Sequence, residues 1–172
     1  MHARMVVLSL GVLGALGCAK AVPDAAFSDA PLELALPSYP DKSPFTLQSR
    51  RGRVVLLDVW ATWCGPCRES LPQYQALVAT LGSKGLDVYT INVDGDAAVP
   101  KEIPKFIAET KLSLPILLDT DAKLSEALLK VKVMPTAFLI DRKGRVRHVH
   151  EGFEHDTFAP VKAQLEALLA EP

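Results

Sequence analysis

Apolar residues in this 172-residue chain alternate between short continuous runs and longer runs with helical spacing. The clearest short run, Val54–Trp60, is apolar at every position except Asp58, as expected of a strand buried on both faces. Further strand-like runs lie at residues 45–47, 86–93, 114–118, 136–140 and 146–149. Helix-like segments lie at residues 66–81, 100–111, 123–129 and from 156 onward. This alternation predicts an α/β fold in which helices cover both faces of a mixed sheet.

The first 18 residues differ in character from the rest of the chain. Arg4 gives a weakly basic start, and residues 5–16 are apolar apart from Ser9, as in the apolar segment of a secretory signal peptide. Cys18 follows Gly17 and resembles the lipidated cysteine of a bacterial lipobox. We therefore expect residues 1–18 to be a signal peptide with a lipobox, and acyl chains on Cys18 to hold the protein on a membrane surface. A spectator cysteine in a cleaved signal or an uncleaved anchor is the alternative.

Composition and charge indicate the domain limits and the classes of partner. Residues 19–40 are rich in proline, which predicts an extended tether before a domain over residues 41–172. The formal net charge is −1, and acidic and basic residues are interleaved along the chain. No basic stripe is present, so nucleic acid is not an expected partner.

Two cysteines carry the chemistry, because Cys64 and Cys67 stand where the strand at 54–60 gives way to the helix at 66–81. The unpaired N–H groups and the positive dipole end of a helix favour thiolate over thiol at Cys64. A thiolate attacks disulfides, so Cys64 is the expected nucleophile, and Cys67, one turn further along, is expected to resolve the mixed disulfide.

Other uses of these cysteines give different expectations. A structural zinc site needs four ligands, and the chain has no second Cys-x-x-Cys or suitable His pair. A purely structural disulfide closing so small a ring stabilises little, and a peroxidase of the peroxiredoxin type needs a different cysteine context. A Cu(I)-binding module built from both cysteines and the Met134 thioether is the main alternative function. A redox-silent docking domain is a third possibility.

The order of these elements resembles a known family. A strand, then Trp63-Cys64-Gly65-Pro66-Cys67, a helix, the later Val133-Met134-Pro135-Thr136, a hairpin and a last helix are similar to the thioredoxin fold. Residues 103–119 resemble the extra helix and strand of the TlpA/ResA-like membrane-anchored thiol–disulfide oxidoreductases. The resemblance covers residues 40–170 and implies a thioredoxin-like fold with an N-terminal β extension and an inserted helix–strand.

The resemblance also assigns roles. It implies that Asp58 takes the proton of Cys67, and burial among apolar neighbours is expected to raise the pKa of that carboxyl. It implies a cis bond between Met134 and Pro135, beside the dithiol, where the backbone pairs with a substrate strand. Trp63 is expected to contribute to the same substrate surface. The Gly-Pro dipeptide between the cysteines is the one found in reducing thioredoxins, which implies a reducing site.

Partners and subfamily follow from the same comparison. We expect the protein to act on the periplasmic side of a bacterial membrane and to reduce disulfides of extracytoplasmic proteins. No cofactor or resident metal is expected, so a transmembrane donor has to supply electrons. The family's glutamate after the dithiol is replaced by Ser70, and Glu69 stands one position early. That shift of about 100 degrees around a helix makes cytochrome c maturation less secure as the specific task.

Overall fold

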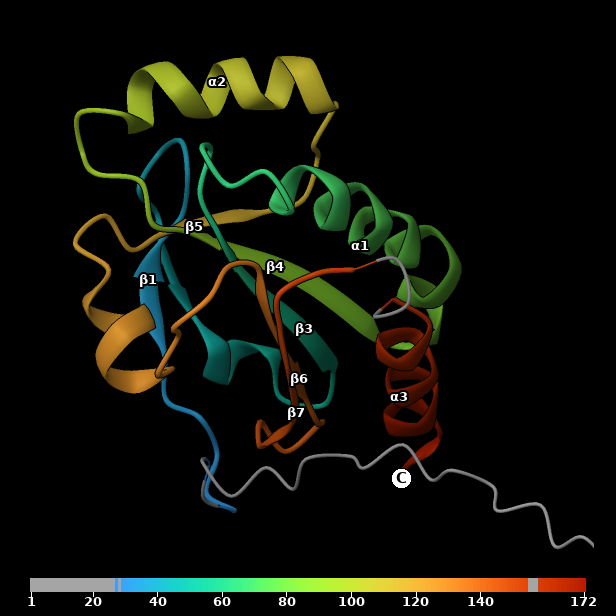
Figure 1. Cartoon of the computed structure of the whole chain (residues 1–172). Coiled ribbons are helices and arrows are strands. Elements are labelled where there is room, and N and C mark those ends of the chain that lie inside the picture. The colour runs from blue at the N-terminus through green and yellow to red at the C-terminus, as the bar shows by residue number, and fades with distance from the viewer. Residues whose placement is uncertain (1–26, 28, 155–157) are drawn as a thin grey trace, which may run out of the picture.

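A mixed sheet of five strands forms the centre of the computed structural model, which describes residues 27, 29–154 and 158–172. The strand order is β5-β4-β3-β6-β7. β4 is parallel to β3 and β5, whereas β6 is antiparallel to both β3 and β7. Figure 1 shows β3 in the middle of the sheet. The strands are β3 (Val54–Trp60), β4 (Leu86–Asn92), β5 (Ile116–Leu118), β6 (Thr136–Ile140) and β7 (Val146–Glu151).

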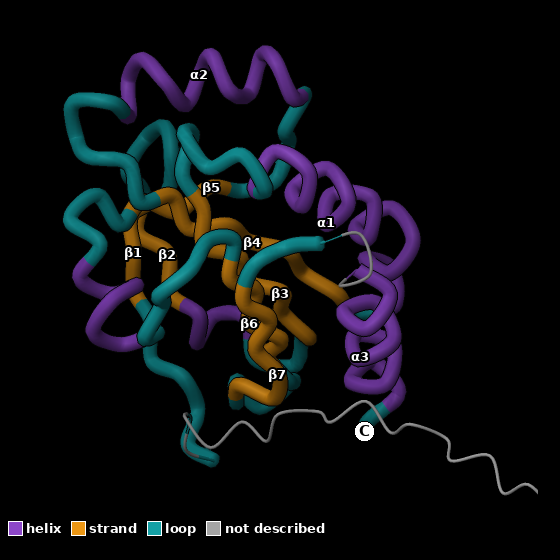
Figure 2. The backbone as a smooth tube through the Cα atoms, viewed as in Figure 1, coloured by secondary structure: helices purple, strands orange, loops and turns teal. Residues whose placement is uncertain are grey.

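Side chains alternate between the two faces of β3, and each face builds its own apolar core. Val54, Leu56 and Trp60 belong to the core under helices α1 (Cys67–Leu81) and α3 (Phe158–Ala170). Val55, Leu57 and Val59 belong to the opposite core, which the N-terminal segment and residues 124–131 cover. Figure 2 shows α1 and α3 packed together on one side of the strands. The expected sheet with two covered faces is confirmed.

Helix α2 (Val99–Thr110) and β5 form the inserted helix and strand that the sequence predicts. Phe106 of α2 packs on Trp60 with ring centroids 4.6 Å apart. The guanidinium of Arg68 lies 4.6 Å from the Phe106 ring centroid and 3.0 Å from Oε2 of Glu109. These contacts join α2 to the first turn of α1, above the sheet in Figure 1.

The N-terminal segment departs from the sequence prediction of a tether over residues 19–40. Strands β1 (Ala35–Pro37) and β2 (Pro44–Thr46) form an antiparallel hairpin, and Leu32, Leu34 and Leu36 are buried. The alternation of apolar and polar residues over 32–36 supplies an apolar face that covers the sheet, so this part belongs to the folded domain. The predicted signal peptide, Cys18 and the first part of the tether lie outside the described residues.

Short helical turns complete the fold. These are two 3₁₀ turns, Leu47–Arg50 and Gly82–Lys84, and a π-helical turn over Leu124–Leu128 where the sequence predicts a helix at 123–129. No helix in the described part of the chain is both long and apolar enough to cross a bilayer.

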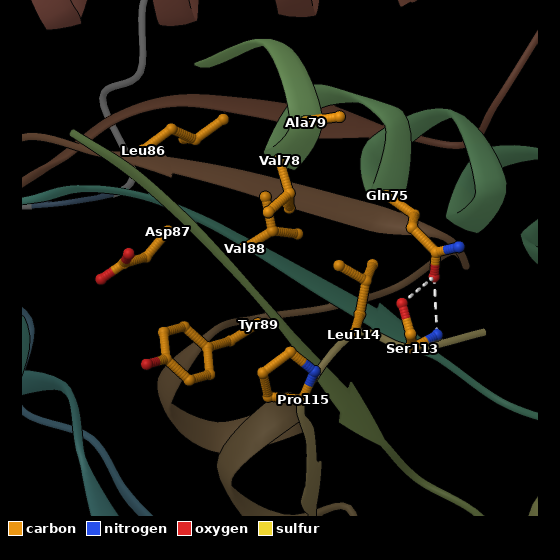
Figure 3. Close-up of a pocket in the computed structure, with 10 residues that line it drawn as sticks. All are labelled: Gln75, Val78, Ala79, Leu86, Asp87, Val88, Tyr89, Ser113, Leu114 and Pro115. Atoms are coloured by element: carbon orange, nitrogen blue, oxygen red, sulfur yellow. Dashed lines mark hydrogen bonds between the residues drawn. The ribbon is translucent and has the colours of Figure 1, made fainter. Parts of the chain in front are cut away.

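A cavity of about 450 Å³ opens between α1, β4 and the segment that precedes β5 (Figure 3). Oε1 of Gln75 accepts hydrogen bonds from the backbone N–H of Ser113, at 2.6 Å, and from its hydroxyl, at 3.1 Å. This pair joins α1 to the loop at one end of the cavity, and none of the predicted site residues lines it.

Candidate active site

Cys64 and Cys67 form a disulfide at the N-terminus of α1, with their Cα atoms 5.3 Å apart. The backbone N–H of Cys67 points to Sγ of Cys64, with 3.2 Å between nitrogen and sulfur. Cys64 is 5% exposed, whereas Cys67 is fully buried. The two sulfurs are therefore unequal, because only Cys64 has both surface access and a helix N–H directed at it.

The local sequence explains how this dithiol is placed. β3 ends at Trp60, and the backbone N–H of Cys64 then bonds to the carbonyl of Ala61 at 3.1 Å, which closes a tight turn. Pro66 directly precedes the helix, where its missing N–H costs no hydrogen bond. Cys64 therefore lies just beyond the C-terminal end of the central strand β3, and α1 begins three residues later, at Cys67.

Asp58 is buried in β3, and both of its carboxylate oxygens lack a hydrogen-bond partner among the described residues. It lies between Leu56 and Trp60 in the alternation of the strand, so it faces the same core as the two cysteines. Burial raises the pKa of Asp58 well above its ordinary value. Burial, together with the charge of Asp58, also raises the pKa of Tyr74. The structure therefore places a carboxyl with a raised pKa on the α1 side of the sheet.

The Met134–Pro135 peptide bond is cis, as the resemblance implies. β6 runs antiparallel to β3 with Thr136 opposite Val59, so this bond lies at the end of β3 from which the dithiol loop leaves. Met134 packs against the apolar core that contains both cysteines. Sequence positions 70 residues apart are thus brought to one site.

Two exposed apolar side chains accompany the site. Trp63, directly before Cys64, is 72% exposed, and Val133, directly before Met134, is 49% exposed. A cavity of about 190 Å³ lies beside Met134, on the face of the sheet opposite Asp58, and Val133 and Ser125 line it. The hydroxyl of Ser125 is buried and has no hydrogen-bond partner in the described part of the chain. The cavity thus combines an apolar lining with a buried hydroxyl that lacks a partner in the described part of the chain.

The structure adds one residue that the sequence reasoning missed. Asp94, only 2% exposed, accepts a hydrogen bond from the backbone N–H of Thr62 at 3.0 Å and another from Nδ2 of Asn92 at 2.8 Å. Polar residues that follow neighbouring parallel strands meet at one edge of a sheet. The Asn92-Val93-Asp94 sequence after an apolar strand carried that signal.

The residues after the dithiol lie as their helical positions predict. Ser70 is buried and its hydroxyl donates to the carbonyl of Cys67 at 3.3 Å, whereas Glu69 is exposed. Glu69 therefore points away from the core in which Cys67 and Ser70 are buried. Within residues 27, 29–154 and 158–172, no group of three or more His, Cys, Asp or Glu side chains is placed to hold a metal ion.

Comparison with known proteins identifies the family of this chain. Residues 19–169 match the Redoxin family. The thiol-disulfide oxidoreductase ResA of Oceanobacillus iheyensis is 32% identical over 112 residues, which are 65% of this chain and 56% of that protein. ResA of Geobacillus thermodenitrificans is 32% identical over 123 residues, covering 71% of this chain and 67% of that protein.

A solved structure of a related protein has a similar fold. The crystal structure of a putative thiol:disulfide interchange protein DsbE from Chlorobium tepidum aligns with a TM-score of 0.75 and 35% identity. The alignment covers 84% of this chain and 98% of that one. The fold is thus thioredoxin-like, and its site holds a Cys-x-x-Cys disulfide. The chain belongs to the Redoxin family and, within it, to the thioredoxin-like thiol–disulfide oxidoreductases.

Proposed function

We propose that this protein reduces disulfides in extracytoplasmic proteins by thiol–disulfide exchange at Cys64 and Cys67. The observation that carries the proposal is the inequality of the two sulfurs. Cys64 keeps a small exposed area and accepts a helix N–H, whereas Cys67 is fully buried in the core that Asp58 also faces. This arrangement separates an attacking thiol from a resolving thiol.

In the proposed reaction, the Cys64 thiolate attacks one sulfur of a substrate disulfide and forms a mixed disulfide. The first substrate thiolate leaves and takes up a proton. Cys67 then passes its proton to Asp58 and attacks Sγ of Cys64, which releases the second substrate sulfur as a thiolate. Two electrons have moved to the substrate, and the protein is left with the Cys64–Cys67 disulfide seen here.

Asp58 suits the proton transfer because its raised pKa brings it toward the range of a thiol. A carboxyl with an ordinary pKa near 3.9 is too weak a base to accept a proton from a buried thiol at neutral pH. Burial raises the pKa of Asp58 and so brings it closer to the pKa of the thiol. After it takes the Cys67 proton, Asp58 is a neutral carboxylic acid, and its carboxylate is regenerated when the proton passes to solvent or to the leaving substrate thiolate.

Substrate proteins are proposed to bind across Trp63 and Val133. The exposed Trp63 ring, directly before Cys64, and the exposed Val133, directly before Met134, supply apolar contact area. An extended peptide that pairs with exposed backbone gains affinity largely independent of its sequence. Such a surface fits a protein that acts on several substrates.

For localisation, we propose the periplasmic side of a bacterial membrane, with lipidation at Cys18. The apolar leader and the lipobox-like Cys18 support this proposal. A protein that reduces substrates is oxidised in each cycle, and the chain shows no cofactor motif that could return the electrons. A transmembrane dithiol donor is the proposed source.

Equilibration of the protein with glutathione buffers tests the proposed direction. A reductant is expected to have a potential nearer the thioredoxin value of about −270 mV than the value of about −180 mV typical of disulfide isomerases. Insulin reduction with the wild-type protein and the Cys64→Ser variant measures turnover in parallel. A potential well above −180 mV would place the protein among the oxidants.

The same preparation tests the copper alternative. Cu(I) titration of the reduced protein, with Met134→Leu as the comparison variant, measures binding by the two thiolates and the thioether. Tight stoichiometric binding that weakens in Met134→Leu, together with no insulin reduction, would replace the oxidoreductase proposal with a Cu(I)-binding module. Turnover without tight binding supports the oxidoreductase.

A further inference from the structure

Asp94 fixes the loop that carries the dithiol, although it follows a different strand, β4. Its Oδ2 accepts from the N–H of Thr62 at 3.0 Å, and its Oδ1 lies 3.3 Å from the same nitrogen. Thr62 is two residues before Cys64. Asn92 holds the carboxylate from its other side, since Nδ2 donates to Oδ2 at 2.8 Å and its own Oδ1 accepts from the Asp94 N–H at 3.1 Å.

This arrangement holds a buried carboxylate against the backbone two residues before the nucleophile, in a place that solvent hardly reaches. A carboxylate that accepts only N–H donors forms charge-assisted hydrogen bonds. At 2% exposure, water screens its charge much less than it screens a surface carboxylate. A nearby negative charge disfavours a thiolate, whereas the N–H of Cys67 and the dipole of α1 favour it. Asp94 and the helix therefore act on Cys64 in opposite directions.

We propose that Asp94 is a positioning residue that anchors the loop before Cys64 and whose negative charge keeps the dithiol reducing. This inference rests on the proposed function and adds a determinant of its direction. Reduction of the Cys64–Cys67 disulfide consumes two electrons and two protons when both thiols remain protonated, and one proton fewer when Cys64 ionises. Any group that destabilises the Cys64 thiolate destabilises the reduced form above that ionisation, which lowers the reduction potential.

The other charged groups at this end of the molecule are arranged differently. Arg68 directs its guanidinium to Glu109 and Phe106 of α2. Asp58 lies in β3 beneath the dithiol, and Glu126 and Lys132 line the cavity beside Met134. All of them remain when Asp94 alone is changed, so their contributions cancel in the comparison of variants.

The experiment compares wild-type protein with Asp94→Asn, which has the same shape. The Asn carbonyl can occupy the place of Oδ2 and accept from both Thr62 and Asn92, so the loop keeps its anchor while the charge is lost. The control is Asp119→Asn. Asp119 is also buried and also accepts two backbone N–H groups, from Leu124 and Ser125, but it follows β5, two strands from β3.

Two quantities are measured in each protein, namely the pH dependence of Cys64 alkylation by iodoacetamide and the equilibrium with glutathione from pH 5 to pH 9. We expect Asp94→Asn to increase the ionisation constant of Cys64 by about threefold to tenfold, the effect of removing one partly screened unit charge. The glutathione equilibrium is expected to shift toward the reduced protein by the same factor at pH 9, or about 14 to 30 mV at 29.6 mV per tenfold. At a pH where alkylation shows Cys64 to be protonated, the two potentials are expected to coincide.

The outcomes separate the inference from the proposed function. Equal ionisation constants in wild type and Asp94→Asn, a shift of the same size at every pH, or an equal shift in Asp119→Asn would each overturn the role of Asp94. Insulin reduction by the wild-type protein would stand in all three cases. If Asp94→Asn does not fold, Asp94→Ser removes the charge while keeping a small acceptor, and the same measurements apply to it.

Discussion

The backbone N–H of Cys67 points at Sγ of Cys64 across 3.2 Å, and it is the first N–H of α1. Such N–H groups have no carbonyl partner within their own helix. When the disulfide opens, the same group and the helix dipole are available to stabilise a thiolate at Cys64. Cys67 is the first residue of α1, is fully buried and faces a core that holds Asp58, so burial disfavours its thiolate.

This asymmetry predicts the behaviour of the single-cysteine variants. In reduced protein at pH 7, Cys67→Ser is expected to react with iodoacetamide at least about tenfold faster than Cys64→Ser, because Cys64 is the more acidic and more accessible thiol. Cys67→Ser is also expected to accumulate mixed disulfides with substrate proteins, since the resolving step is lost. Mass spectrometry under non-reducing conditions detects them. Equal alkylation rates in the two variants would contradict the assignment of Cys64 as nucleophile.

Asp58 predicts an unusual dependence of stability on pH. Its pKa is raised in the folded protein by burial, so the folded state holds this proton more tightly than the unfolded state does. The stability from this group is fully present below the unfolded pKa of about 3.9 and is lost as pH rises toward the folded pKa. Asp58→Asn is therefore expected to match the oxidised wild type at pH 3.5 and to exceed it above that pH. The excess grows by about 1.4 kcal/mol per pH unit until the folded pKa is reached.

Urea unfolding of both oxidised proteins from pH 3.5 to pH 8 measures this difference. A stabilisation of Asp58→Asn that is constant with pH would show that the variant acts through packing and not through loss of the proton. In the reduced protein, the same variant is expected to accumulate the mixed disulfide with substrate, because Cys67 loses its proton acceptor. Quenched-flow alkylation resolves this step from the initial attack.

The sequence was most informative where a motif and an apolar pattern overlap. Val54–Trp60 predicted a strand buried on both faces. Burial of a charged carboxylate is costly, so the sequence alone pointed to Asp58 as a carboxyl with a raised pKa before its neighbours were known. The start of the folded domain was harder to place, because prolines on both sides obscure the short alternating pattern at residues 32–36. Its apolar face becomes meaningful only when the uncovered face of the sheet is known.

Sites formed between strands were harder to predict. Asp94 and Thr62 are 32 residues apart, and no spacing rule links the residue after one parallel strand to the loop after the next. The cavity beside Met134 combines residues from β3, the 122–126 segment and the 131–134 segment. Hydrophobic patterning predicts which residues are buried, but which polar side chains meet at the end of a sheet depends on the strand order.

The exposed valines on this molecule allow a matched test of the substrate surface. Val133 is 49% exposed beside Met134, and Val78 is 41% exposed on α1 at the cavity remote from the dithiol. We expect Val133→Asp to lower kcat/KM for insulin reduction by about fivefold to thirtyfold, equivalent to 1–2 kcal/mol of lost apolar contact. Val78→Asp adds the same charge at similar exposure and is expected to leave kcat/KM unchanged.

Both variants are also assayed with a small disulfide that contacts only the cysteines. The rate of Val133→Asp with the small disulfide is expected to equal that of the wild type, because the substitution removes binding surface and not thiol chemistry. Equal losses in Val133→Asp and Val78→Asp with insulin would locate substrate binding elsewhere. A loss in Val133→Asp with both substrates would mean that the dithiol itself had been disturbed.

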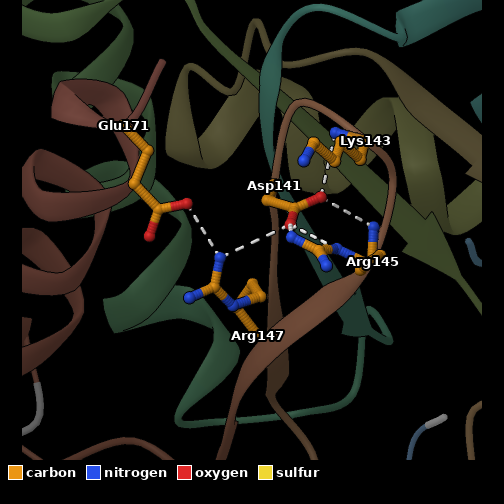
Figure 4. Close-up of polar contacts among 5 residues, drawn as sticks. All are labelled: Asp141, Lys143, Arg145, Arg147 and Glu171. Atoms are coloured by element: carbon orange, nitrogen blue, oxygen red, sulfur yellow. Dashed lines mark hydrogen bonds and ion pairs between the residues drawn. The ribbon is translucent and has the colours of Figure 1, made fainter. Parts of the chain in front are cut away.

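Asp141 holds the turn between β6 and β7 at the other end of these strands (Figure 4). Its carboxylate accepts from the backbone N–H groups of Lys143 and Arg145, both at 2.9 Å, and from Nε of Arg145 at 2.8 Å. Burial alone would raise the pKa of Asp141, but the hydrogen bonds and charge of Arg145, with the Lys143 N–H, lower it. Arg147 continues the cluster, with Nη1 3.4 Å from the Asp141 carboxylate and 2.8 Å from that of Glu171.

For a carboxyl whose folded pKa is lowered, stability is present above the unfolded pKa and is lost as pH falls through the folded pKa. Asp141→Asn is therefore expected to destabilise the protein by about 1–3 kcal/mol at pH 7, since two backbone donors and Arg145 lose their charged acceptor. The deficit is expected to shrink below pH 4. Urea unfolding at pH 7 and pH 3 measures it, with exposed Asp121→Asn as the control that changes little. Because Asp141 lies far along β6 from Pro135, insulin reduction per folded molecule should be unaltered, and a selective loss of activity would contradict a purely structural role.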